Sequence, residues 1–167
     1  MKRLLILAAL AVTAWADTQR FAACLNAPTC ANVTLAASAT ALTVQQPAVT
    51  AGVPGVAMQL ESATIYCSVA CSVTQRQNET TAATATASTP KAIAPVNGAP
   101  NGTAYSASNA SGGTVIPPVL TLPAGSTITL DLSSITLPAG NAKSSYTVAI
   151  ASLTGDVNIT IVWKEVQ

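Results

Sequence analysis

Four cysteines are the residues of this chain whose type and spacing could most directly do chemistry. They are Cys24, Cys30, Cys67 and Cys71. A zinc site would use Cys-x2–4-Cys knuckles or histidines, but Cys24-x5-Cys30 does not fit and the chain has no histidine. A redox pair would need Cys-x-x-Cys in a thioredoxin-like setting, which is absent. An even number of cysteines in an exported chain predicts two disulfides instead.

The pairing of these cysteines depends on the shape of residues 66–73, YCSVACSV. In a straight strand Cys67 and Cys71 would lie on one face about 13 Å apart, whereas a disulfide joins Cα atoms about 4.4–6.8 Å apart. Either residues 68–70 form a tight turn and this pair closes locally, or each cysteine bonds one of the first two. Because residues 26–28 are turn-like, we favour two local loops. The alternative would staple the N-terminal segment to the core.

Acid–base chemistry has few candidate residues. The chain lacks histidine, the commonest general base. Its six carboxylates are Asp17, Glu61, Glu79, Asp131, Asp156 and Glu165. Glu61 and Asp131 could still meet as a glycosidase pair, but we expect each carboxylate to be a solvated surface or turn residue. No phosphate loop, calcium loop or nucleophile elbow occurs. The sequence therefore predicts a non-enzyme with no catalytic or metal-binding residues and no cofactor.

The N-terminus, MKRLLILAALAVTAWADTQR, has the pattern of a secretory signal peptide. A positively charged start, the apolar residues 4–14 and the small residues of Ala14-Trp15-Ala16 predict cleavage after Ala16. The apolar run is shorter than the roughly 20 residues of a membrane span. A lipid anchor on Cys24 is opposed by the polar residues 17–20. We therefore expect a secreted or extracytoplasmic protein, in the periplasm or on a cell or particle surface, with no membrane span after cleavage.

Alternation with a period of two residues dominates the rest of the chain, and no convincing amphipathic helix follows the signal. In residues 156–164 the apolar side chains Val157, Ile159, Ile161 and Trp163 share one face, which predicts that Trp163 packs in the core. Further strand candidates are residues 32–35, 41–44, 56–60, 126–132 and 145–151. Many short strands separated by turns predict an all-β fold, an antiparallel β-sandwich with disulfides. This plan resembles jelly-roll sandwiches of secreted bacterial modules and virion proteins, by pattern alone.

The expected domain organisation has three parts. The signal peptide, residues 1–16, precedes an N-terminal arm, residues 17–30, which contains Cys24 and Cys30. A single sandwich domain follows, residues 31–167.

Two segments of this domain are candidate contact regions. The sequence TLPAG at 121–125 recurs at 136–140, which predicts two similar turns at one end of the sandwich. Residues 89–102, with three prolines and two Asn-Gly steps, predict a long loop, either a flexible connection or a contact surface. Tyr105 lies just beyond this loop and is the best candidate for an exposed ligand contact.

Charge and composition narrow the choice of partners. Once the signal peptide with Lys2 and Arg3 is removed, the chain has five basic and six acidic residues. Because these charges nearly cancel, we expect no nucleic acid partner. Low charge, small side chains and disulfides favour a non-catalytic exported structural or surface-assembly protein, such as a coat, fibre or cell-surface subunit. Its partner would be itself, as a homo-oligomer, or an extracellular surface. The alternative is a secreted glycan- or ligand-binding module. Assembly would use an uncovered apolar face or an unpaired, uncharged strand edge, whereas binding would use exposed aromatic rings in a groove.

Overall fold

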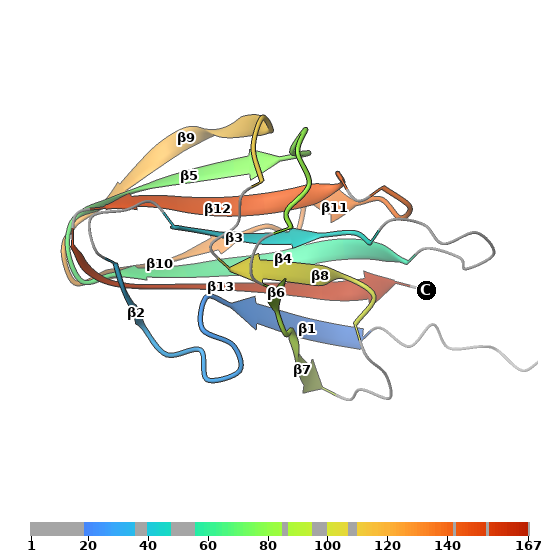
Figure 1. The fold of residues 1–167 in the computed structure, drawn as a ribbon, viewed down its shortest axis with the longest axis horizontal. Coiled ribbons are helices and arrows are strands. Elements are labelled where there is room, and N and C mark those ends of the chain that lie inside the picture. The colour runs from blue at the N-terminus through green and yellow to red at the C-terminus, as the bar shows by residue number, and fades with distance from the viewer. Residues whose placement is uncertain are drawn as a thin grey trace, which may run out of the picture.

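The computed structural model describes residues 19–35, 40–47, 56–84, 87–94, 100–106, 110–141, 143–152 and 154–166. The signal peptide expected at residues 1–16 lies outside these ranges. Every regular element within them is a β-strand, and the strands form two antiparallel sheets that pack face to face (Figure 1). The prediction of an all-β sandwich is confirmed.

The first sheet is built around two long strands, β4 and β13, which pair along most of their length. Its strand order is β10 (Ser126–Asp131), β4 (Ala57–Cys67), β13 (Gly155–Val166), β1 (Gln19–Cys24) and β7 (Lys91–Ala94). Two short strands complete it, β11 (Thr136–Leu137) on β4 and β2 (Val33–Leu35) on β13.

The second sheet is centred on β12, which pairs with β3 on one side and β5 on the other. Its strand order is β6 (Ala87–Ser88), β8 (Thr103–Ser106), β3 (Thr40–Gln45), β12 (Ser145–Ser152), β5 (Cys71–Gln77) and β9 (Thr114–Leu122).

The core lies between the sheets and follows the alternation of the sequence. From β13 it takes Val157, Ile159, Ile161 and Trp163, and from β12 Tyr146, Val148 and Ile150, all fully buried. Trp163 packs against Phe21 of β1 with ring centroids 5.9 Å apart. The core role predicted for Trp163 is therefore confirmed. Burial of such large side chains is the main term stabilising the fold.

Two parts of the expected domain organisation differ from the structure. Part of the N-terminal arm, residues 17–30, forms strand β1, which lies between β13 and β7 and buries Phe21. The long loop at residues 89–102 contains strand β7, which pairs with β1. Neither strand shows an extended apolar alternation, because β1 is short and alanine-rich and β7 is exposed. The sandwich therefore includes the residues from Gln19 onward.

The two TLPAG turns lie at opposite ends of β4, so the expectation that they share one end is wrong. The first precedes β10, where Ser126 pairs with Cys67, and the second begins in β11, where Thr136 pairs with Gln59. The repeat spacing is thus the length of one pass along β4. Both turns carry the chain between the two sheets, and both use a glycine with positive φ, Gly125 at 71° and Gly140 at 93°.

Candidate functional site: buried carboxylates and an open sheet edge

All four cysteines are joined locally. Cys24 bonds Cys30 and Cys67 bonds Cys71, with Cα–Cα distances of 5.3 and 6.4 Å. Residues 68–70 form the tight turn that the second pair requires, and this turn carries the chain from β4 in one sheet to β5 in the other. The two disulfides indicate an oxidising, extracytoplasmic environment.

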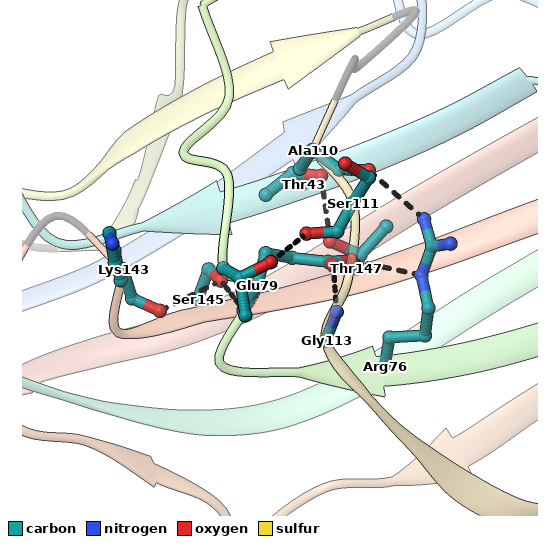
Figure 2. Close-up of polar contacts among 10 residues, drawn as sticks. Thr43, Arg76, Glu79, Ala110, Ser111, Gly113, Lys143, Ser145 and Thr147 are labelled. Carbon is teal, nitrogen blue, oxygen red and sulfur yellow. Dashed lines mark hydrogen bonds and ion pairs between the residues drawn. The ribbon is translucent and has the colours of Figure 1, made fainter.

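Glu79 is a fully buried carboxylate that follows β5 and lies over the outer face of the second sheet (Figure 2). Its Oε1 atom lies 2.9 Å from Nε of Arg76. These two atoms are not aligned for a hydrogen bond, and neither has a hydrogen-bond partner among the described residues, so their contact is an ion pair. The other oxygen accepts a hydrogen bond of 2.7 Å from the Gly113 backbone N–H. The Glu79 N–H donates to Ser145 Oγ at 3.0 Å.

The residues around Glu79 form a polar layer that covers β3 and β12. Beneath it, the hydroxyls of Thr43 and Thr147 are 2.8 Å apart and fully buried. The Gln45 amide bonds the backbone N–H and C=O of Ala83. Arg76 donates to the Ala110 carbonyl at 3.3 Å. Residues 79–84 and 110–113 thus cover this part of the sheet and provide hydrogen-bond partners for the Gln45 amide and for Arg76.

A second buried carboxylate, Glu165, lies near the end of β13 and is 2% exposed. It accepts hydrogen bonds from the backbone N–H groups of Asn101 and Gly102, at 3.0 and 2.8 Å. The Asn101 side chain and Trp163 Nε1 donate to it at 2.9 and 3.3 Å. Among the described residues Glu165 forms no ion pair, and its charge is balanced by N–H donors.

These arrangements hold loops in place and do not assemble an acid–base pair. Both carboxylates are buried, and each has an oxygen bound to a glycine N–H. The Ser145 hydroxyl donates to the Lys143 carbonyl at 3.1 Å, so its proton is not directed at Glu79. Within the described part of the chain, no three His, Cys, Asp or Glu residues form a group that could hold a metal ion.

The residues singled out from the sequence are held separately. Glu61 pairs with Arg20 at 2.5 Å across β4 and β1, at the surface. Asp131 ends β10 and accepts a hydrogen bond of 2.9 Å from the Ser133 N–H, which lowers the pKa of that carboxyl. Tyr105 is half-buried in β8, between β3 and β6. Glu61 and Asp131 thus lie on the paired strands β4 and β10, with Asp131 opposite Ser62, but their carboxylates have different partners, Arg20 and the Ser133 N–H.

Sequence reasoning missed both buried glutamates, which were expected to be solvated. A signal for Glu165 was present, because it continues the alternation of Ile161 and Trp163 on the buried face of β13. Glu79 follows the end of β5 and had no such signal. Its burial depends on residues 110–113, more than thirty positions later, which fold over it.

The free edges of the sheets differ in how far they are protected against pairing. Strands β2 and β6 are three and two residues long, and β7 carries Lys91. Strand β9 contains Pro117 and Pro118 and a register shift against β5. Charge, proline and bulges are the usual protections of an edge strand. Strand β10 has none of these within Ser126–Leu130, and in the described structure it pairs only with β4, in unbroken register.

No family model, curated protein or solved structure matches this chain. Among the described residues, no helix is long and apolar enough to cross a membrane.

Proposed function

We propose that this protein is an exported, non-catalytic structural subunit that assembles on a cell or particle surface. The observation that carries the proposal is the regular open edge of β10. It pairs with β4 at six consecutive positions and has no proline or bulge. Its only charge is Asp131 at the end of the strand. An edge of this kind presents unpaired N–H and C=O groups that another strand can bond.

The interior supports the same role. The unit is made rigid by two disulfides, by the core between the sheets and by the loop residues that Glu79 and Glu165 bind. The buried carboxylates serve this rigidity. The described surface also carries few charges, since no charged residue occurs from residue 92 to residue 130. Low charge does little to oppose contact between copies.

The test is native mass spectrometry of the exported protein across a dilution series, with and without reductant. An oligomer or polymer is the expected result, and a monomer at all concentrations would contradict the proposal. The same spectra report cleavage after Ala16. They also report the loss of four hydrogen atoms expected from the two disulfides.

A further inference from the structure

We propose that β10 pairs antiparallel with β10 of a second copy of this chain, centred on Ile128. This inference rests on the proposed assembly function and names the partner and the contact. Thr127 of one copy would lie opposite Thr129 of the other, and the two-fold axis through the contact would make two such pairs. The first sheet of one copy would join the first sheet of the other into one continuous sheet across the axis.

The backbone of β10 has the correct groups at its open edge. Leu132 N–H donates to the Glu61 carbonyl at 3.0 Å, and this bond continues the register in which Asp131 pairs with Ser62. Bonding groups alternate along an antiparallel strand. Ile128 and Leu130 therefore direct their backbone groups toward β4, while Thr127 and Thr129 direct theirs outward.

With Ile128 on the axis, each Thr127–Thr129 pair would exchange both of its backbone hydrogen bonds. This gives four backbone bonds in all. The threonine side chains are exposed on the outer face. Cross-strand Thr–Thr contacts are favourable, and this sheet already contains one, with the hydroxyls of Thr64 and Thr129 3.2 Å apart. The pairing would thus extend an existing row of threonines.

The charge distribution favours a second copy over a charged partner. Residues 92–130 carry no charge, so two copies of this edge would meet without repulsion. Asp131 would lie level with Gly125 of the other copy, about 20 Å from the second Asp131 at 3.3–3.4 Å per residue. The same surface is used by both copies, so the contact closes as a dimer.

A charge-swap pair of variants tests both the edge and the register. In T127K/T129K every paired position would bring lysines together, and we expect the dissociation constant to rise at least about 100-fold. In T127K/T129E each lysine would face a glutamate, and we expect a dissociation constant within about 10-fold of the wild type. Both positions are exposed, so each variant should fold. Sedimentation velocity over a concentration series gives the constants, and circular dichroism checks the fold.

The control is Val119→Lys, which changes an exposed residue of β9 and should leave association unchanged. Association that survives T127K/T129K but is lost in Val119→Lys would overturn the β10 pairing and leave the assembly function standing. A wild-type monomer would overturn both. Hydrogen exchange of the wild type gives an independent check. The Thr127 and Thr129 amides should be protected only at concentrations where the protein associates, and protection in the monomer would overturn the pairing.

Discussion

Glu79 and Glu165 hold two loops by the same device but balance their buried charge in different ways. Each accepts the N–H of a glycine just before a strand, Gly113 before β9 and Gly102 before β8. Glu79 has an arginine beside it, whereas the partners of Glu165 in the described part of the chain are all N–H donors. We call these the Glu79 clamp and the Glu165 clamp.

The difference follows from the surroundings of each clamp. The Glu79 clamp lies on the outer face of the second sheet, where Arg76 can reach it from β5 with its side chain 25% exposed. The Glu165 clamp lies beside Trp163 in the core, where a second charge would also have to be desolvated. A buried carboxylate can therefore be stabilised either by one partly solvated cation or by several oriented dipoles.

The largest expected effect is loss of the cation in the Glu79 clamp. In Arg76→Met, Glu79 Oε1 would keep no partner, and we expect the free energy of unfolding to fall by about 3–5 kcal/mol. Urea denaturation measures it. The matched control is Arg20→Met, which breaks an ion pair with side chains 48% and 26% exposed and should cost no more than about 1 kcal/mol. Equal losses in the two variants would show that burial does not determine how much an ion pair contributes to the free energy of unfolding.

The Glu165 clamp should be sensitive to loss of an acceptor. In Glu165→Gln one oxygen becomes an NH2 group that faces N–H donors, and we expect a loss of about 1–3 kcal/mol. The control Glu61→Gln, at the surface, should cost no more than about 1 kcal/mol. Hydrogen exchange locates the effect. The Gly102 amide should lose protection while the Gly113 amide keeps it, and parallel changes at both would mean that the clamps are not independent.

The glycines of the two clamps should differ in their tolerance of alanine. A Cβ on Gly113 would lie 2.7 Å from the Gln77 carbonyl oxygen and 2.6 Å from Glu79 Oε2, whereas one on Gly102 would meet the end of Met58 at 2.6 Å. Backbone cannot move aside as a methionine can. We expect Gly113→Ala to cost about 1–3 kcal/mol and Gly102→Ala to cost less, by urea denaturation. The reverse order would show that Met58 is fixed by its burial.

The sequence was enough to predict the sandwich but not the clamps. Alternation in β13 identifies Trp163 as a core residue because burial imposes a period of two on a strand. The short reach of a disulfide left two pairings open for Cys67 and Cys71, and the favoured one, a local pair with a tight turn at residues 68–70, is confirmed. The clamps depend on contacts between distant segments. The Glu79–Gly113 bond spans 34 residues and the Glu165–Gly102 bond 63, and no local pattern specifies such pairs.

The sequence predicted that assembly would use an uncharged strand edge, but it did not show which strand forms that edge. The sequence shows that residues 126–130 carry no charge or proline, but not that β10 lies at the margin of its sheet. That position follows from the strand order. The repeated TLPAG turns were misplaced for the same reason, because the number of residues between them does not say which strand the chain follows. Sheet topology, rather than local preference, supplied this information.

The smallest expected effect comes from Tyr146, a buried neutral side chain. Comparison with the two clamps separates the effect of burying a polar group from the effect of burying a charge. Tyr146 is fully buried and donates to Gln75 Oε1 at 2.7 Å. At neutral pH, Tyr146→Phe should lower the free energy of unfolding by about 1 kcal/mol, less than loss of either clamp, because one neutral hydrogen bond is lost.

Burial raises the pKa of Tyr146 in the folded protein, whereas an unfolded tyrosine has a pKa of about 10. Above that pH the unfolded chain releases a proton that the folded protein keeps, so the stability contributed by neutral Tyr146 is present below about pH 10 and falls as the pH rises. Urea denaturation at about pH 8 and about pH 10.5 should therefore show a smaller loss of stability in Tyr146→Phe than in the wild type. An equal loss in both proteins would place the alkaline sensitivity in a titratable group other than Tyr146.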